Sequence, residues 1–176
     1  MSRSIVIVPI LAFGLATPVF AGGPTTSINP EYLATMNLPL DTPQPITDSL
    51  SVYPLKGGAI EGPRIIGKIL APAADWGRMM SSGVFRIDVR ATIQTDDSAM
   101  IYLSYEGNIN CSKEKWDQFA KGEQLKEGDC YFITAPRFET KAEKYKWLNE
   151  VQAVGKMVSV KGGNDGYVRY DLFVIR

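Results

Sequence analysis

The stretch VFRIDVRATIQTDDSAMIYLSYEG, residues 84–107, decides the fold that the sequence predicts. Apolar and polar residues alternate along it, and a period of two is typical of a β-strand with one buried face. Its polar centre, Thr95–Ser98, is typical of a turn. We therefore expect two antiparallel strands, Val84–Gln94 and Ala99–Gly107, joined as a hairpin.

Short segments of similar character lie on both sides of this hairpin. The further strands that we expect are Ser49–Leu55, Arg64–Ala71 (closed by Pro72), Cys130–Thr140, Glu150–Lys161 and Tyr167–Ile175. Lys113–Lys121 is the expected helix, and Lys141–Leu148 is expected to be a turn or a short helix. Because closure of a sheet removes its unpaired edges, we favour a barrel over a sandwich. The prediction is an all-β fold: a single closed antiparallel β-barrel with one short helix in a loop.

The start of the chain has the features of a secretory signal peptide. Arg3 is followed by the apolar run Ile5–Ala16 and by a small-residue cleavage pattern that ends at Ala21. The alternative interpretation of this segment is a buried first helix or strand. The apolar run is too short to span a membrane as a helix. We expect a signal peptide over 1–21, an irregular proline-rich lead-in over 22–48, a barrel domain over 49–176, and a periplasmic or secreted protein with no membrane span in the mature chain.

Composition narrows the possible functions. The 19 Lys and Arg residues balance the 19 Asp and Glu residues, so nothing indicates a nucleic-acid partner. The sequence contains no histidine, which excludes catalytic triads and metal sites that need imidazole. We expect no metal site and no cofactor, and a small molecule as the partner. The two cysteines, Cys111 and Cys130, are expected to form a disulfide in an oxidising compartment, with two buried free thiols as the alternative.

Several polar residues could carry chemistry, and each has a plainer interpretation. Arg86, Asp88 and Arg90 share one strand face, which is either a solvated outer face or a polar barrel interior. Asp75 precedes Trp76, and a carboxyl enclosed beside an aromatic ring suits a general acid or base; the alternative is a turn aspartate that caps its own backbone.

The second half of the chain adds further candidates. Arg137 and Glu139 share a strand face, so they belong either to a pocket or to a network at its rim. Tyr102 and Tyr105 have opposite parity, so only one of them can face inward. The remaining candidates are Asp96 in the hairpin turn, where turn chemistry is the simpler reading, and Tyr145, Trp147 and Asn149 at alternate positions.

The order of three segments resembles a known family. PAADWG (72–77), FRIDVRATIQTDDSAMIYLSYEG (85–107) and YFITAPRFETKAEKYKWLN (131–149) are similar to the family called domain of unknown function 3237, over about Ser51 to Arg176. The resemblance implies a small closed antiparallel β-barrel and an inward-facing Arg90. The positions that recur in the family fall here on Asp75, Trp76, Arg90, Asp96, Tyr105, Arg137, Glu139, Tyr145, Trp147 and Asn149. Ser98 stands in place of a usual glycine, and Ile133 in place of a frequent arginine.

Two functional hypotheses follow. The first is a cofactor-free acid–base enzyme of the isomerase, cyclase, hydratase or lyase type, acting on a small, aromatic compound. In it, Asp75 or Glu139 is the acid or base, and Arg90 and Arg137 hold a carboxylate or an oxyanion. Trp76, Tyr105, Tyr145 and Trp147 pack the ring. The second hypothesis is a periplasmic carrier of a small apolar or aromatic ligand. Both predict a pocket lined by Asp75, Arg90 and Glu139.

Overall fold

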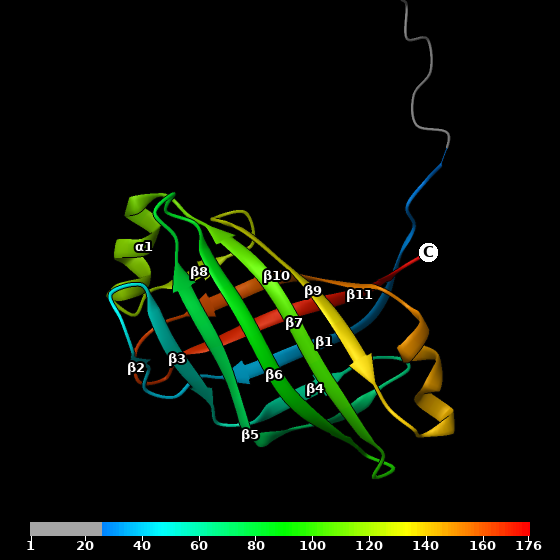
Figure 1. Ribbon diagram of the computed structural model, residues 1–176. Helices are drawn as coiled ribbons and strands as arrows, with labels where there is room; N and C mark the ends of the chain where they lie inside the picture. Colours follow the sequence, from blue (N-terminus) through cyan, green and yellow to red (C-terminus); the bar gives the residue numbers. More distant parts are fainter. Residues whose placement is uncertain (1–25) are drawn as a thin grey trace, which may run out of the picture.

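The structure is a computed structural model that describes residues 26–176 (Figure 1). The expected signal peptide at 1–21 lies outside the described residues. The strands are β1 (Pro30–Pro39), β2 (Gln44–Pro45), β3 (Leu50–Leu55), β4 (Gly58–Glu61), β5 (Ile66–Met79), β6 (Phe85–Thr95), β7 (Met100–Asn110), β8 (Gln124–Lys126), β9 (Tyr131–Glu139), β10 (Ala153–Lys161) and β11 (Tyr167–Ile175). They are joined by one α-helix, α1 (Lys113–Ala120), and one 3₁₀ helix, η1 (Glu143–Glu150).

The strands form a closed antiparallel β-barrel, as the sequence predicted. The sheet runs in the order β2-β3-β5-β4-β1-β11-β10-β9-β7-β6, and it closes because β5 also pairs with β6. Closure gives the strands of the ring partners on both sides, which removes the open edges of the sheet. The buried apolar side chains of the ring strands form one core inside the ring.

The hairpin predicted from the alternating pattern is β6 and β7. The two strands pair along their length, from Phe85 opposite Ile109 to Gln94 opposite Met100. The apolar face of β6 is inside the barrel, since Val89 and Ile93 are almost completely buried. The polar face, with Arg86 and Arg90, is outside. The plainer interpretation of that face is therefore the correct one.

The prediction that Pro72 closes a strand is wrong. β5 continues to Met79, and its register with β6 shifts between Leu70, which lies opposite Thr92, and Ala74, which lies opposite Arg90. A bulge of this kind accommodates a residue such as proline that has no N–H to give to the ladder. Beyond the shift, β5 pairs with β3 instead of β4. Asp75 consequently lies in a strand and not in a turn.

The prediction of an irregular segment over 22–48 is also wrong for part of its length. β1 occupies Pro30–Pro39 and pairs with β11 and β4, so it belongs to the barrel wall. Ala34, Met36 and Leu38 are at most 1% exposed, and polar residues alternate with them. This period of two is present in the sequence, but the prolines on both sides of it obscured the pattern.

The two ends of the barrel are covered differently. α1 lies at one end, near β2 and β3, while η1 lies at the other, near the turn between β6 and β7 (Figure 1). Both helices fall close to their predicted positions, and so does the last hairpin, β10 and β11. No helix among residues 26–176 is long and apolar enough to cross a bilayer.

Candidate functional site

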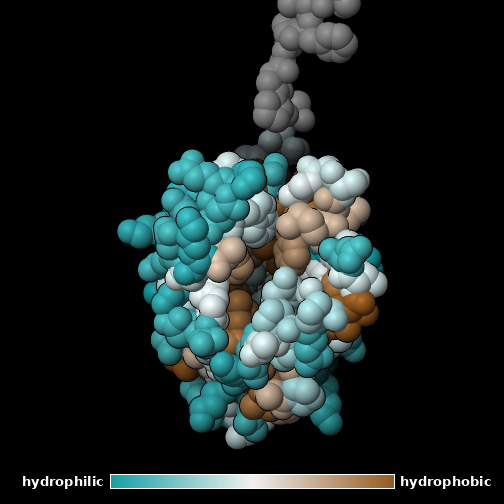
Figure 2. All heavy atoms as spheres, turned by 90° about the vertical axis from the view of Figure 1, so that its left-hand side faces the viewer, coloured by the Kyte–Doolittle hydropathy of each residue, from teal (hydrophilic) through white to brown (hydrophobic). Residues whose placement is uncertain are grey.

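A cavity of about 290 Å³ opens at the end of the barrel that carries α1. This volume is close to the lower limit of small-molecule sites, about 300 Å³. Figure 2 faces this end and shows apolar residues in a hollow between more polar rims. The aromatic side chains in the lining are Tyr53, Phe85, Trp116, Phe119, Phe132 and Tyr170. We refer to this cavity as the mouth pocket.

The carboxyl group of Asp75 lies in the mouth pocket. On β5 it has the same parity as Ala73 and Gly77, which are buried, while Trp76 has the opposite parity and is 43% exposed on the outside. Oδ1 of Asp75 accepts a 2.9 Å hydrogen bond from the backbone N–H of Asp88 on β6. One carboxyl oxygen is thus anchored to the barrel wall, and Oδ2 is left for other contacts.

Burial shifts the acidity of the groups around this carboxyl. Loss of hydration raises the pKa of Asp75 from its ordinary 3.8 to about 7, because an apolar environment disfavours the charged form. Burial also raises the pKa of Tyr53, Tyr105 and Tyr170, and the negative charge of Asp75 adds to the shift of each. At neutral pH the three phenols are therefore uncharged, while Asp75 is present in both protonation states.

An aromatic cluster in the barrel interior lies near Asp75. Tyr105 is 3% exposed, and its ring meets that of Tyr170 edge to face, with centroids 5.9 Å apart. Phe132 meets Tyr170 on another side at 5.4 Å. Tyr102 is 43% exposed on the outer face, whereas Tyr105 faces inward. This agrees with the prediction that only one of the two tyrosines can face the interior.

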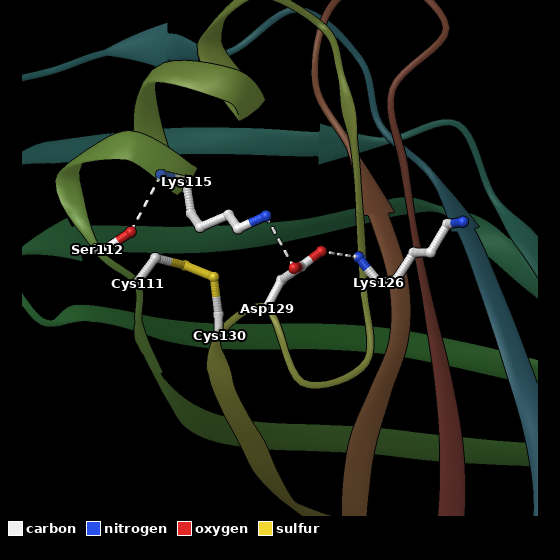
Figure 3. Close-up of a disulfide and its surroundings, with 6 residues drawn as sticks. All are labelled: Cys111, Ser112, Lys115, Lys126, Asp129 and Cys130. Atoms are coloured by element: carbon white, nitrogen blue, oxygen red, sulfur yellow. Dashed lines mark hydrogen bonds and ion pairs between the residues drawn. A yellow bond between two sulfur atoms is a disulfide. The ribbon is translucent and has the colours of Figure 1, made fainter.

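The loop that carries α1 covers one side of the mouth pocket, and a disulfide holds it in place. Cys111 and Cys130 are bonded, with Cα atoms 4.6 Å apart, which confirms the predicted pairing. Ser112 caps α1 by accepting a hydrogen bond from the backbone N–H of Lys115. The ammonium of Lys115 in turn lies 2.8 Å from Asp129 (Figure 3). Both cysteines line the pocket, so the disulfide joins the loop that carries α1 directly to the pocket wall.

Two of the three residues predicted to share a pocket lie elsewhere. Arg90 forms an ion pair with Asp88 on the outer face, where both side chains are 42% exposed. Glu139 is exposed on the outer face of β9. The prediction of one pocket lined by Asp75, Arg90 and Glu139 is therefore wrong. The interior is too narrow for charged side chains on every strand, and apolar residues fill it instead.

Other predicted site residues gather on the outside. Arg137, Glu139 and Asn149 line one shallow groove on the outer face. Trp76 lies in another outer groove, over β5, β6 and β7. None of these four shares the mouth pocket with Asp75, since they lie on the opposite side of the barrel wall.

Tyr145, Trp147 and Asn149 belong to η1, which closes the opposite end of the barrel. The hydroxyl of Tyr145, which is 1% exposed, donates to the carboxylate of Asp97 at 3.1 Å. Asn149 holds η1 against the end of β9, because its side chain bonds both the N–H and the C=O of Thr140 at 2.9 Å. The guanidinium of Arg64 lies 3.6 Å from the centre of the Trp147 ring. Each of these contacts supports the fold at that end.

Asp96 and its neighbours form the turn at this end. Oδ1 of Asp96 accepts a 3.0 Å hydrogen bond from the backbone N–H of Asp97, which is ordinary turn chemistry. Ser98 has a φ of 66° and so takes the left-handed conformation that glycine adopts more easily. Among residues 26–176, no three Cys, Asp or Glu side chains come close enough to hold a metal ion.

Sequence reasoning singled out Asp75 and the two cysteines but missed the rest of the mouth pocket, including Tyr53, Trp116 and Tyr170. The sequence could have identified Tyr170 as an inward-facing residue, because it has the same parity as Val168 and Leu172, which are buried on β11. It could not have identified Trp116, since the sequence does not say where a loop helix packs. Its indole Nε1 is buried and has no hydrogen-bond partner within the described part of the chain.

Comparison with known proteins agrees with the barrel. The family described as protein of unknown function, DUF3237, matches residues 28–175. A UPF0311 protein of Bradyrhizobium diazoefficiens is 31% identical over 99 residues, which cover 56% of this chain and 64% of that protein, just under two thirds of its length.

Solved structures show the same architecture. A β-barrel-like protein from Acinetobacter baumannii is 33% identical and superposes with a TM-score of 0.69, over 89% of this chain and 99% of that chain. An enzyme from Penicillium herquei is 23% identical, with a TM-score of 0.61 over 88% of this chain and 99% of that chain, a likeness of fold. The family match spans nearly all of the described barrel, and the chain therefore belongs to the DUF3237 family.

Proposed function

We propose that the protein is an exported, cofactor-free acid–base enzyme that acts on a small aromatic compound in the mouth pocket, with Asp75 as the general acid and base. The observation that carries this proposal is the enclosure of the Asp75 carboxyl among aromatic side chains. The reaction types that fit are isomerisation, cyclisation, hydration and elimination, because each needs acid–base catalysis and none needs an oxidant or a reductant.

The position of Asp75 suits proton transfer in both directions. A group with a pKa of about 7 is both a competent base and a competent acid at neutral pH. With Oδ1 held by the N–H of Asp88, Oδ2 is the atom that takes a proton from one substrate carbon and returns it to another. In an isomerisation or a cyclisation the proton and the bonding electrons balance within the substrate. In a hydration water supplies the added hydrogen and hydroxyl, and in an elimination the leaving group departs with the electron pair of its bond.

The arginines have no part in this proposal. Arg90 and Arg137 lie on the outer face, so an oxyanion in the mouth pocket is stabilised by uncharged donors. The phenols of Tyr53 and Tyr170 line the pocket and remain protonated at neutral pH. Donors held in place in an apolar site stabilise developing charge more strongly than donors in water.

Export is supported by two features. The disulfide is of the kind that persists in the periplasm and outside the cell. The leader at 1–21 has the order of segments of a signal peptide. Mass spectrometry of the exported protein tests this part: cleavage after Ala21 and a mass two hydrogen atoms below that of the reduced chain are expected.

A carrier without chemistry is the second candidate. Of the described residues that line the mouth pocket, Asp75 alone carries a charge, and a lining so apolar suits a carrier of small apolar ligands. The likeness to the Penicillium herquei enzyme is compatible with catalysis in a barrel of this shape, but it extends to the fold alone.

A binding screen followed by a turnover assay separates the two candidates. Small aromatic compounds are screened by thermal shift, and each one that binds is incubated in D₂O and followed by NMR. An enzyme introduces solvent deuterium or forms a product, and Asp75→Asn lowers that rate by about 10²–10⁴-fold while binding remains. Asp88→Asn is the matched control, because it makes the same change on the outer face and keeps the backbone N–H. Binding of several compounds without exchange or product in the unmodified protein favours the carrier.

A further inference from the structure

We propose that the mouth pocket selects uncharged ligands: a small aromatic compound with one hydrogen-bonding oxygen, a carbonyl or a hydroxyl, directed at Asp75. The inference rests on the proposed site and deepens it by naming the class of substrate. It reverses the expectation that arginines hold a carboxylate of the substrate.

The first argument is the absence of a counter-charge. None of the described residues that line the mouth pocket is a lysine or an arginine. Lys115, one residue before Trp116 on α1, is paired with Asp129 at 2.8 Å (Figure 3). A carboxylate that enters an apolar site without a cation loses its hydration and gains no ion pair in return. Binding an anion here is therefore unfavourable.

The second argument is the charge already present. The titratable groups that face Asp75 are Tyr53 on β3, Tyr105 on β7 and Tyr170 on β11, and all of them are neutral phenols at pH 7. The charge of Asp75 itself opposes ionisation of each phenol. The same charge repels an anionic ligand at the same distance.

The third argument is the number of polar contacts on offer. Oδ1 of Asp75 is occupied by the N–H of Asp88, so the carboxyl offers one contact through Oδ2, and the phenols of Tyr53 and Tyr170 are neutral partners for the same ligand oxygen. When protonated, Oδ2 donates to a carbonyl oxygen; when ionised, it accepts from a hydroxyl. The rest of the lining is dominated by rings such as Phe85 and Trp116, which pack against an aromatic ligand. One oxygen on an aromatic frame matches this arrangement.

Four probes of nearly equal size test the selectivity: 2-naphthaldehyde, 2-naphthol, 2-naphthoate and 2-naphthylmethylammonium. Their binding to the full mature protein is measured by isothermal titration calorimetry at pH 7.5. The aldehyde and the alcohol are expected to bind at least about tenfold more tightly than the carboxylate. The inference is overturned if the carboxylate binds as tightly as the neutral probes, if the ammonium binds most tightly, or if none of the four binds.

A gain of function provides a second test. Met79 lines the mouth pocket and is 38% exposed at its rim, so a lysine there can place its ammonium at the opening. Met79→Lys is expected to bind 2-naphthoate about tenfold more tightly than Met79→Gln, the matched control, which has a polar side chain of similar length without the charge. Equal affinity of both variants for the carboxylate contradicts the inference.

Failure of this inference and failure of the proposed function give different results. Tight binding of the carboxylate refutes the selectivity whether or not any probe is turned over. Preference for the neutral probes, with no deuterium exchange in any compound tested, leaves the selectivity standing and removes the catalytic role of Asp75.

Discussion

The backbone N–H of Asp88 donates a 2.9 Å hydrogen bond to Oδ1 of Asp75, which joins the pocket carboxyl to the neighbouring strand. The side chain of Asp88 itself lies on the outer face, paired with Arg90. One residue thus contributes its backbone to the inside of the barrel and its charge to the outside. The bond fixes which oxygen of Asp75 is free, and the predictions below begin from that carboxyl.

Asp75 makes the stability of the protein depend on pH. Its pKa is about 7 in the folded state against 3.8 when exposed, so the folded state binds the proton more strongly and the free energy of unfolding falls as pH rises from 4 to 7. Between pH 5 and pH 8 the unmodified protein is expected to lose roughly 3 kcal/mol relative to Asp75→Asn. Urea unfolding of both proteins across this range measures the difference. Parallel curves contradict the burial of the carboxyl.

The outer-face residues Arg90 and Glu139 are expected to be dispensable for turnover. Neither side chain reaches the mouth pocket, so Arg90→Gln and Glu139→Gln change kcat/KM by about twofold at most. The measurement uses whichever compound the screen shows to be turned over, with Asp75→Asn as the inactive reference. A hundredfold loss of kcat/KM in either variant would show that the replaced residue takes part in catalysis.

The disulfide is expected to support both stability and ligand binding. Cys111 and Cys130 are separated by 19 residues, and a bond that closes a loop of this length contributes roughly 3 kcal/mol. Replacement of both cysteines by serine is therefore expected to lower the urea midpoint of unfolding. It is also expected to weaken binding in the mouth pocket, because the disulfide anchors the loop that carries α1 and Trp116. Reduction of the unmodified protein is the control and shifts both quantities in the same direction. Unchanged affinity in the double variant shows that α1 is held by packing alone.

Asp97 is expected to stabilise the closed end of the barrel at neutral pH. Hydrogen bonds from Lys144, Thr95 and Tyr145, the first of these being strongest, lower the pKa of Asp97 to about 2. Its contribution is therefore present above pH 4 and is lost as pH falls towards 2. Thermal unfolding of Asp97→Asn is expected at a lower temperature than that of the unmodified protein at pH 7, with the two converging at pH 2. Asp96→Asn, the neighbouring control, is expected to unfold like the unmodified protein at both values.

Replacement of Ser98 by glycine is expected to stabilise the protein. Its φ of 66° is unfavourable for a residue with a Cβ atom, and glycine takes this conformation without the steric cost. After the greater chain entropy of unfolded glycine is subtracted, Ser98→Gly raises the free energy of unfolding by about 0.5–1 kcal/mol. Chemical denaturation provides the measurement, with Ser104→Gly, within strand β7, as a control that destabilises. A loss of stability in Ser98→Gly contradicts the assignment of strain.

Much of the barrel was predictable because its strands have a period of two. Val84–Gln94 shows on which face Val89 and Ile93 lie without any knowledge of their neighbours, and the structure buries that face. Parity likewise placed one of Tyr102 and Tyr105 inside. β1 could have been recognised in the same way, but the prolines around Ala34–Leu38 made the segment look irregular.

The candidate site was predictable only in part. Asp75 is in the pocket, but Arg90 and Glu139, predicted beside it, are outside. Tyr145 and Asn149, which the sequence analysis placed among the site residues, stabilise the far end of the barrel instead. Order along the chain does not distinguish a residue that lines a pocket from one that closes the opposite end, because a barrel strand reaches both.

The sequence by itself indicated most of the long strands, the closed sheet and the cysteine pair, since these depend on local alternation and on residue types; it missed β1 and the second half of β5. The tertiary structure decided which carboxyl is enclosed. A bulge at Pro72 carries β5 past β4 to pair with β3, and the loop that holds α1 folds over the opening. Burial depends on what surrounds a group from every side. The acidity of Asp75 is therefore a property of contacts among β3, β5, β11 and α1, distant segments that meet only in the folded barrel.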